Sequence, residues 1–268
     1  MSNNKPIGVF DSGLGGLTVF KELKKVLPNE NFIYFGDTGR VPYGNRSKET
    51  ILKYALEDET FLLTKDVKLI IAACGTVSSL TDKSGKNLPV PFFEMITPAA
   101  IAAAKATRTK KIGVIGTVAT VNSNAHKKEL LKIGQFDVLA VSCPLFVPLV
   151  ENGLTNKDDV VVKEIVSRYL KDLKDFGCDT LILGCTHYPA LYDAIDDYFE
   201  HSVKLINPGE ELSIVVKKYL EQNSMLNSEN TDGTTEFYVS DHPDAFCDQA
   251  KAILGEDITG GALLIDIN

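Results

Sequence analysis

The sequence lacks the features of a membrane or secreted protein. None of its apolar runs approaches the roughly 20 residues that a membrane-spanning helix requires. Its polar start, up to Pro6, has no basic segment followed by an apolar one, so we expect a cytoplasmic protein without a membrane partner. Clusters of Lys and Arg are also lacking, and the net charge of -8 argues against nucleic acid as a partner.

The cysteines show no paired spacing. There is no C-x-x-C and no Cys/His cluster, so we expect free thiols and neither a disulfide framework nor a metal site. Three of the five are expected to be buried apolar side chains away from strand ends: Cys143 precedes a proline, Cys178 precedes a predicted strand, and Cys247 lies near the end of the chain.

The other two cysteines each end a short apolar run. Cys74 follows the Ile- and Leu-rich run 67–73, and Cys185 follows the similar run 180–184. Each run is long enough for one buried strand. Because ligands bind at the carboxyl ends of strands in open α/β sheets, the two thiols are predicted to face one pocket from opposite sides.

The predicted strands repeat along the chain. Four elements recur in the same order about a hundred residues later, which indicates a duplicated α/β unit. The pairs are Lys5–Ser12 with Lys110–Thr117, Phe32–Gly36 with Phe136–Ala140, the strand ending at Cys74 with the one ending at Cys185, and Val90–Glu94 with Val203–Asn207. The fold class is therefore predicted as α/β, with two similar domains that arose by internal duplication.

The last part of the chain has no counterpart in the repeat. It is predicted to contain helix Gly209–Gln222, strand Glu236–Ser240 and helix Pro243–Leu254, and to return to the first domain. We therefore assign residues 1–96 with 210–268 to the first domain and residues 97–209 to the second. A further helix, Lys48–Leu63, has a predicted core face formed by Ile51, Leu52, Ala55, Leu56, Phe61 and Leu62.

Several residues beside the two thiols suit acid–base chemistry. His187 lies two positions beyond Cys185, while Asp11 and Glu151 lie on predicted loops. A thiolate is a base as well as a nucleophile, and two equivalent thiols suit a reaction whose two directions are mirror images. Removal of an α-proton on one face and its return on the other, which is racemisation or epimerisation beside a carboxylate, fits that description.

The same reasoning favours a reaction without a cofactor, since no pyridoxal-type motif is recognisable. Charge developing on the substrate carboxylate would then be stabilised by loop amides and hydroxyls, with Ser12, Thr76, Thr117 and Thr186 as candidates. Three alternatives stay open: a Cys/His acyl-transfer or decarboxylating enzyme, a non-catalytic protein that binds an acidic amino acid, and a racemase for aspartate.

Five motifs together resemble glutamate racemase, of the aspartate/glutamate racemase superfamily. They are Asp11–Thr18, Gly36–Gly44, the strand ending at Cys74, Cys143–Glu151 and Gly184–Pro189. The resemblance implies an isomerase of two α/β domains, with the active site in the cleft between them, that interconverts L- and D-glutamate without a cofactor. It also implies a role of this D-amino acid in peptidoglycan biosynthesis, and so in cell wall biogenesis and cell shape, and it is compatible with a homodimer.

The resemblance also implies individual roles. Cys74 is expected to act on the D-enantiomer and Cys185 on the L-enantiomer, assisted by Asp11, His187, Glu151 and Asp37. The predicted substrate-binding residues are Asp11, Ser12, Tyr43, Gly44, Gly75, Thr76, Thr117, Thr120, Thr186 and His187. Two positions depart from the family: Gly75 stands where an Asn is usual, and Asn124-Ala-His126 where a Gly and a Tyr are more common.

Overall fold

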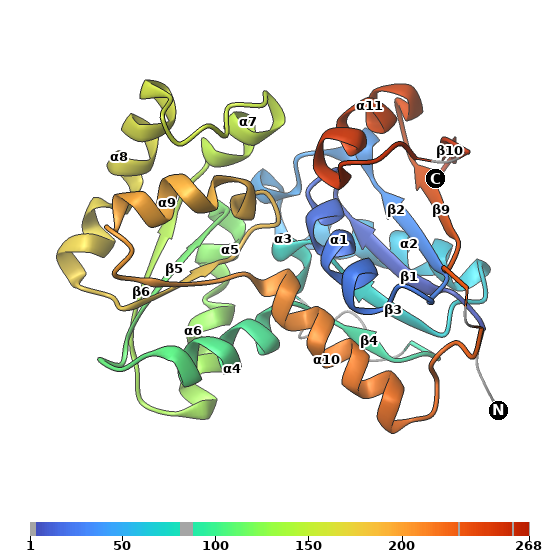
Figure 1. Ribbon diagram of the computed structural model, residues 1–268, viewed down its shortest axis with the longest axis horizontal. Coiled ribbons are helices and arrows are strands. Elements are labelled where there is room, and N and C mark those ends of the chain that lie inside the picture. The colour runs from blue at the N-terminus through green and yellow to red at the C-terminus, as the bar shows by residue number, and fades with distance from the viewer. Residues whose placement is uncertain (1–3, 81–87, 230, 259, 268) are drawn as a thin grey trace.

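The computed structural model describes residues 4–80, 88–229, 231–258 and 260–267. The chain forms two lobes, each built on one parallel β-sheet (Figure 1). We call the lobe around the six-stranded sheet the first lobe and the lobe around the four-stranded sheet the second lobe. The parallel strands and their helical crossovers confirm the predicted α/β fold class.

The sheet of the first lobe has the strand order β10-β9-β2-β1-β3-β4. Its strands are β1 (Ile7–Asp11), β2 (Phe32–Gly36), β3 (Leu69–Ala72), β4 (Phe92–Phe93), β9 (Thr235–Val239) and β10 (Ala262–Leu264). Both faces are covered, because Phe32 and Tyr34 of β2 belong to one apolar cluster while Ile33 and Phe35 belong to another. Such two-sided burial explains why these strands are continuous apolar runs.

The sheet of the second lobe has the order β6-β5-β7-β8, from β5 (Lys111–Gly116), β6 (Asp137–Ser142), β7 (Thr180–Leu183) and β8 (Lys204–Ile206). Its order corresponds to β2-β1-β3-β4 of the first lobe. In both sheets the first strand of the unit is central and lies parallel to its two neighbours. The duplication read from the sequence is therefore consistent with the topology.

The C-terminal part of the chain joins the first lobe. Strand β9 pairs with β2, Phe32 opposite Thr235, and β10 pairs with β9. The buried side chains of Lys68 and Glu30 form an ion pair. Glu30 also accepts a 2.8 Å hydrogen bond from the backbone N–H of Asn227, which ties the C-terminal part of the chain to the first lobe. The domain limits 1–96 with 210–268 and 97–209 remain a prediction.

The helices connect these strands. They are α1 (Gly16–Val26), α2 (Lys48–Thr64), α3 (Gly75–Ser78), α4 (Ile96–Ala106), α5 (Val118–Ser123), α6 (Ala125–Ile133), α7 (Phe146–Glu151), α8 (Val160–Phe176), α9 (Tyr192–Tyr198), α10 (Pro208–Gln222) and α11 (Pro243–Leu254), with short 3₁₀ turns η1 (Thr38–Arg40), η2 (Tyr43–Asn45) and η3 (Tyr188–Leu191). Side-chain caps mark several starts: Ser47 caps α2, Thr117 caps α5 and Asp159 caps α8.

Two expectations from the sequence are wrong. Leu56 is 58% exposed, whereas Asp58 and Glu59 of the same helix are buried, because α2 turns part of its inner face toward polar groups. Cys143 directly follows β6, which extends two residues beyond the predicted strand, so this cysteine does lie at a strand end. Cys143 and Cys178 are buried as expected, while Cys247 is only half-buried.

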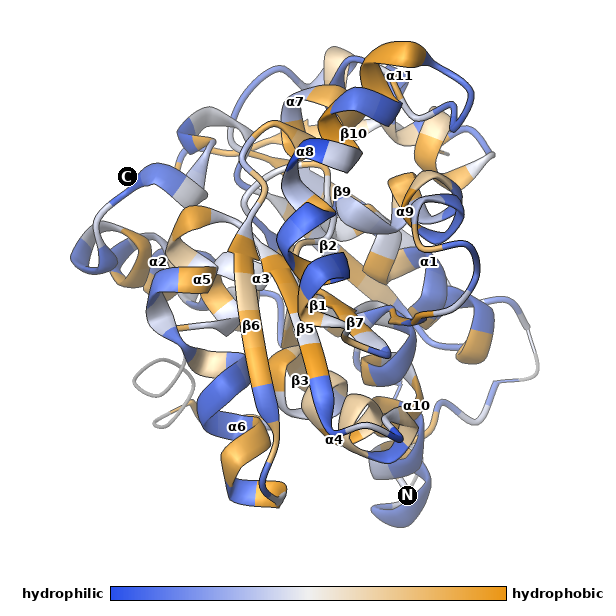
Figure 2. Ribbon diagram, turned by 90° about the vertical axis from the view of Figure 1, so that its left-hand side faces the viewer, coloured by the Kyte–Doolittle hydropathy of each residue, from blue (hydrophilic) through white to orange (hydrophobic). Residues whose placement is uncertain are grey.

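Hydropathy follows this architecture. Strands β5 and β6 are apolar along most of their length and polar at their starts (Figure 2). Among the described residues, no helix combines the length and apolar character needed to cross a membrane.

Candidate active site

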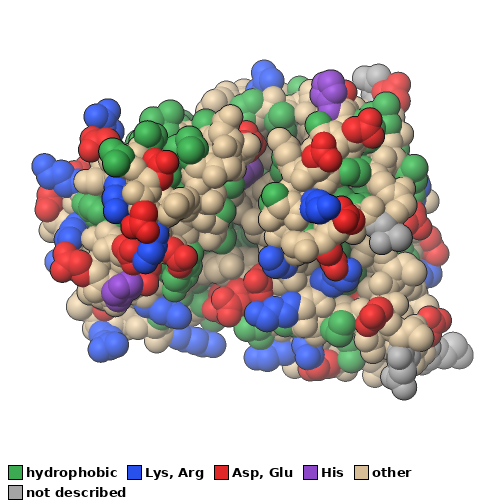
Figure 3. All heavy atoms as spheres, turned by 45° about the horizontal axis from the view of Figure 1, so that its top comes forward, with side chains coloured by type: hydrophobic (Ala, Val, Ile, Leu, Met, Phe, Trp, Pro, Cys, Tyr) green, Lys and Arg blue, Asp and Glu red, His purple; other side chains and the backbone are tan. Residues whose placement is uncertain are grey.

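A cavity of about 210 Å³ lies between the two lobes, at the carboxyl ends of both sheets. The space-filling view shows the groove between the lobes in which it lies (Figure 3). The first lobe contributes Ser12, Tyr43, Gly44, Cys74, Gly75 and Thr76, and the second contributes Thr117, Glu151, Cys185, Thr186 and His187. Eleven of the predicted site residues therefore line one cavity, in the position that the strand-end argument indicates.

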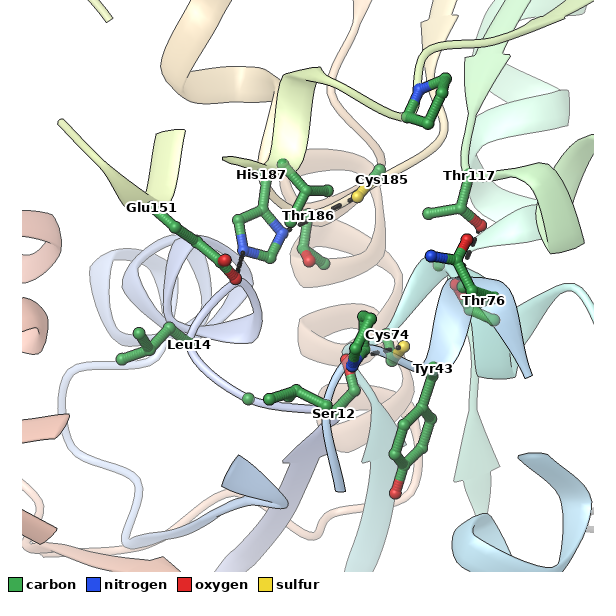
Figure 4. Close-up of a pocket in the computed structure, with 18 of the residues that line it drawn as sticks. Ser12, Leu14, Tyr43, Cys74, Thr76, Thr117, Glu151, Cys185, Thr186 and His187 are labelled. Atoms are coloured by element: carbon green, nitrogen blue, oxygen red, sulfur yellow. Dashed lines mark hydrogen bonds and ion pairs between the residues drawn. The ribbon is translucent and has the colours of Figure 1, made fainter. Parts of the chain in front are cut away.

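The two cysteines occupy equivalent places. Cys74 lies two positions beyond β3, and Cys185 lies two positions beyond β7. Both side chains are largely buried, with 4% and 7% exposure. In Figure 4 the two sulfur atoms lie on opposite sides of the pocket, Cys74 with the first lobe and Cys185 with the second. The duplication thus delivers one thiol to each wall of the cavity.

Cys74 lies in an environment that favours the neutral thiol. Burial, together with the nearby Asp11 carboxylate, raises the pKa of Cys74 to about 12. Its Sγ donates a long hydrogen bond to the Ser12 hydroxyl, at 3.6 Å. At neutral pH Cys74 is therefore protonated and suited to donate a proton.

Cys185 lies in a different environment. Its Sγ is 3.8 Å from Nδ1 of His187, and Nε2 of that ring is 3.2 Å from Oε1 of Glu151 (Figure 4). Burial lowers the pKa of His187, but the hydrogen bonds with Cys185 and Glu151 and the charges of Cys185 and Asp11 outweigh it and raise the pKa to about 10. Cys185 therefore has a cationic imidazolium beside its sulfur atom, a group that Cys74 lacks.

Asp11 ends β1 behind the cavity. Its carboxyl group is 1% exposed, and Oδ2 accepts a 2.9 Å hydrogen bond from the backbone N–H of Gly13. Oδ1 is buried without a hydrogen-bond partner among the described residues. Burial raises the pKa of Asp11, against the lowering effect of His187 and of the N–H groups of the glycine-rich loop. The carboxylate therefore acts on both thiol environments through its charge rather than from the cavity wall.

Hydroxyl groups connect the lobes around the cavity. Oγ1 of Thr76 is 3.0 Å from Oγ1 of Thr117, and Thr117 is 2.9 Å from Oγ1 of Thr120. On another side, Thr18 donates to the backbone carbonyl of Thr186 at 2.8 Å. These contacts hold hydroxyl groups from both lobes near one another, as a site that binds a carboxylate requires.

Three predicted residues do not line the cavity. Asp11 lies behind Ser12, and Thr120 is buried behind Thr117. Asp37 is fully buried in a cluster on the far side of the Tyr43 ring, and the Tyr43 hydroxyl points away from the two cysteines (Figure 4). Asp37 can therefore reach the thiols only indirectly in this structure.

Sequence reasoning did not single out the apolar part of the wall. Leu14, Val41, Pro42, Pro144, Val147 and Pro148 line the cavity beside the polar residues. All of them lie inside the motifs that carry the family resemblance. The motifs therefore contain these positions, whereas reasoning from the chemistry of single residues did not select them. Among the described residues, no group of three or more His, Cys, Asp or Glu side chains could hold a metal ion.

Gly75 lies where the lobes touch. A Cβ atom at this position would lie 2.4 Å from the carbonyl oxygen of Gly184 in the second lobe. Any side chain at position 75 would therefore require the Gly184 backbone to move. This chain therefore has Gly in place of the usual Asn at a point where the backbones of residues 75 and 184 lie close together beside the cavity.

Comparison with known proteins gives a consistent result. The model of the Asp/Glu/Hydantoin racemase family matches residues 18–212. A glutamate racemase of Geobacter metallireducens is 43% identical over 94% of this chain and 93% of its own length. Another, from Thermoanaerobacter pseudethanolicus, is 43% identical over 99% of this chain and 98% of its own.

Solved structures agree with the sequence relatives. Glutamate racemase isoform RacE1 of Bacillus anthracis superimposes with a TM-score of 0.94 at 36% identity, over 98% of both chains. Glutamate racemase of Francisella tularensis, solved with D-glutamate, superimposes with a TM-score of 0.89 at 35% identity, over 99% of this chain and 98% of that chain. An aspartate racemase of Picrophilus torridus, 17% identical with a TM-score of 0.60, shares the fold.

The duplicated α/β lobes, the cavity between them and these similarities define the class: the protein is an isomerase, an amino-acid racemase. Within that class, the chain belongs to the Asp/Glu/hydantoin racemase family and to its glutamate racemases.

Proposed function

We propose that the protein interconverts L- and D-glutamate by a two-base mechanism in which Cys74 and Cys185 are the bases, without an added cofactor. The observation that carries the proposal is the pair of thiols at equivalent strand ends, facing one cavity from opposite lobes. Glutamate is favoured as the substrate because the relatives compared above are glutamate racemases at 35–43% identity over almost the whole chain.

The surroundings of the two thiols described above suit the L-to-D direction. The Cys185 thiolate removes the α-proton of L-glutamate, and the electron pair of the C–H bond moves toward the substrate carboxylate. The Cys74 thiol then donates its proton to the opposite face of the α-carbon. The product is D-glutamate, and the enzyme is left with a Cys185 thiol and a Cys74 thiolate. Turnover of D-glutamate, or proton exchange with solvent, restores the starting state.

The difficult step is formation of the carbanion-like transition state. The hydroxyls of Ser12, Thr76 and Thr117 and the loop amides are proposed to stabilise the negative charge that develops on the carboxylate. Thr186 and Gly44 are proposed to help hold the substrate, as is the Gly75 backbone N–H, since that position has no side chain. Glu151 and His187 are proposed to assist Cys185, and Asp11 to assist Cys74.

The biological setting is proposed on the family relationship. D-glutamate would supply peptidoglycan precursors and so serve cell wall biogenesis, in the cytoplasm. A homodimer is the proposed assembly. The cysteine-rich cavity and the relatives together favour this function over acyl transfer by a single Cys/His pair, which would need only Cys185 and His187.

The direct test is proton NMR of L-glutamate in deuterated buffer with the purified protein and no added cofactor. We expect loss of the α-proton signal and formation of D-glutamate. The same measurement with L-aspartate tests the runner-up substrate, whose side chain is one methylene shorter, a difference worth about 1–3 kcal/mol in a pocket. If the α-proton exchanges in aspartate and not in glutamate, aspartate is the substrate. Stabilisation by glutamate without any exchange would favour a binding protein.

The pKa of His187 gives a pH-dependent prediction. Since its pKa is raised to about 10, the imidazolium that favours the Cys185 thiolate is lost only as the pH rises through that value. Glu151→Gln removes one of the groups that raise this pKa, so the alkaline limit of kcat/KM for L-glutamate is expected to move to lower pH. NMR titration of the His187 ring should shift in the same direction. An unchanged titration of the His187 ring in the variant would contradict the role of Glu151, and this measurement, made without substrate, does not depend on the substrate ammonium group.

A further inference from the structure

A buried polar cluster lies behind the cavity wall formed by residues 41–45. It consists of Asp37, Arg40, Tyr43 and Asp58, and we call it the Asp37 cluster. Asp37 and Asp58 are fully buried and Tyr43 is 1% exposed. None of the three polar groups faces the cavity, although Tyr43 presents one side of its ring to it. The cluster thus belongs to the structure of the wall and not to its surface.

Arg40 is the cation of the cluster. Its Nε donates to Oδ2 of Asp37 at 2.6 Å and its Nη2 donates to Oδ1 of Asp58 at 2.8 Å. Nη1 forms an ion pair with Glu57 at the outer edge. The guanidinium plane also lies over the Tyr54 ring, 4.1 Å from its centre. Arg40 therefore ties the start of the loop to two successive acidic residues of α2.

The hydrogen-bond geometry of the cluster bears on where its protons lie. The Tyr43 hydroxyl donates to Oδ2 of Asp37 and is 3.1 Å from Oδ2 of Asp58. One hydroxyl has one proton, so a proton on Asp58 lets both contacts be full hydrogen bonds at the same time. Burial and the Asp37 charge raise the pKa of Asp58 well above its usual range, against the lowering effect of Arg40. Two charged carboxylates buried in one cluster would repel each other, which also favours a proton on Asp58.

The C-terminal part of the chain reaches the same cluster. Ser240, directly after β9, donates to Oδ1 of Asp37 at 2.7 Å and accepts from the backbone N–H of Gly39 at 2.8 Å. Next to it, the backbone N–H of Asp241 donates to the Thr38 hydroxyl at 2.9 Å. The loop after β2 is thus held from three directions: by its own Arg40, by α2 and by the end of β9.

We propose that the Asp37 cluster positions the cavity wall at residues 41–45, with a protonated Asp58 joined to Asp37 through the Tyr43 hydroxyl. Val41, Pro42, Gly44 and Asn45 line the cavity in the segment that the cluster holds. A Cβ atom on Gly44 would lie 3.0 Å from Cβ of Thr117, so this wall also touches the second lobe. Asp37, Tyr43 and Asp58 are therefore positioning residues, and Asp37 acts on the substrate through the wall.

Two variants with the same chemical change test the proposal. In Asp58→Asn the amide reproduces the protonated acid: its oxygen accepts from Arg40, and its NH₂ donates to the Tyr43 oxygen. In Asp37→Asn an NH₂ group replaces one acceptor oxygen and the negative charge is lost. At least one of the hydrogen bonds that Asp37 accepts from Arg40, Tyr43 and Ser240 is therefore disturbed. We expect Asp37→Asn to raise KM for L-glutamate about tenfold or more with a smaller change in kcat, and Asp58→Asn to keep KM within about twofold.

Hydrogen–deuterium exchange of residues 38–46 provides a readout that does not need turnover. Exchange is expected to be faster in Asp37→Asn than in the wild type and unchanged in Asp58→Asn, with Asp248→Asn on the exposed face of α11 as a control. The KM measurement depends on the proposed function, whereas the exchange measurement does not, so failure of one is distinguishable from failure of the other.

The outcomes that overturn the proposal are specific. Equal losses in Asp37→Asn and Asp58→Asn would overturn the proton assignment, and wild-type exchange and KM in both would overturn the positioning role. If Asp37→Asn does not fold, Tyr43→Phe and Ser240→Ala take its place. Each removes one bond to Asp37, and each is expected to speed exchange in residues 38–46 and to raise KM about threefold or more. Wild-type behaviour of both would likewise overturn the proposal.

Discussion

Replacing either Cys74 or Cys185 by serine is expected to lower kcat for glutamate racemisation by about 10²–10⁴-fold in both directions. Each thiol serves as base in one direction and as acid in the other, so neither direction can proceed normally with one of them missing. The serine hydroxyl is nearly the same size as the thiol, which preserves the packing at both strand ends. Circular dichroism detection of L- and D-glutamate, starting from each enantiomer, measures both directions.

Two other cysteines provide matched controls. Cys247 is half-buried on α11, and Cys178 is buried in the core of the second lobe. Serine at Cys247 is expected to leave kcat unchanged, while serine at Cys178 is expected to affect stability without a comparable loss in kcat. Full activity of either the Cys74 or the Cys185 variant would refute the two-base proposal and favour a mechanism with a single thiol.

Proton exchange without racemisation gives a finer view of the same variants. A protein that keeps one thiol can still remove and return the α-proton on one face, although it cannot complete the inversion. In deuterated buffer we expect residual exchange of L-glutamate in the Cys74 variant and of D-glutamate in the Cys185 variant. This pattern follows from the assignment of Cys185 to the L-enantiomer.

The paired thiols could be predicted from the sequence because their signal is local. Each cysteine directly follows a short apolar run, and the second run follows the first at about the spacing of the other repeated elements. A parallel sheet places the ends of neighbouring strands at one edge, so the position of each thiol follows from the strand alone. His187 lies two positions beyond Cys185, so its closeness to that thiol is also a local signal. Its contact with Glu151 of α7 joins residues 36 positions apart and has no such signal.

The orientation of Asp37 could not be predicted in this way. It follows a strand as the site cysteines do, yet its side chain turns toward Arg40, Asp58 and Ser240. Its surroundings come from α2 and from the end of β9, which is about 200 residues further along the chain. The buried face of α2 was misjudged for the same reason: Asp58 is buried because the cluster supplies its partners, and Leu56 is exposed.

The second large effect concerns the groups behind each thiol. His187→Asn and Asp11→Asn are each expected to lower kcat/KM about 10²-fold. The imidazolium of His187 favours the Cys185 thiolate, and Asp11 lies close enough to Cys74 for its charge to raise the pKa of that thiol. Because the two enantiomers have equal free energy in solution, each variant must lose kcat/KM by the same factor in both directions.

The asymmetry of the site then emerges in isotope effects. In His187→Asn, transfer between the α-carbon and Cys185 becomes the dominant barrier, so the effect of α-deuteration should rise for L-glutamate and fall for D-glutamate. Asp11→Asn should show the opposite pattern, because it weakens the Cys74 half. His242→Asn and Asp158→Asn, at exposed positions away from the cavity, are controls. Equal isotope effects from both enantiomers in both variants would mean that His187 and Asp11 do not serve separate thiols, and the division of roles between the two lobes would have to be abandoned.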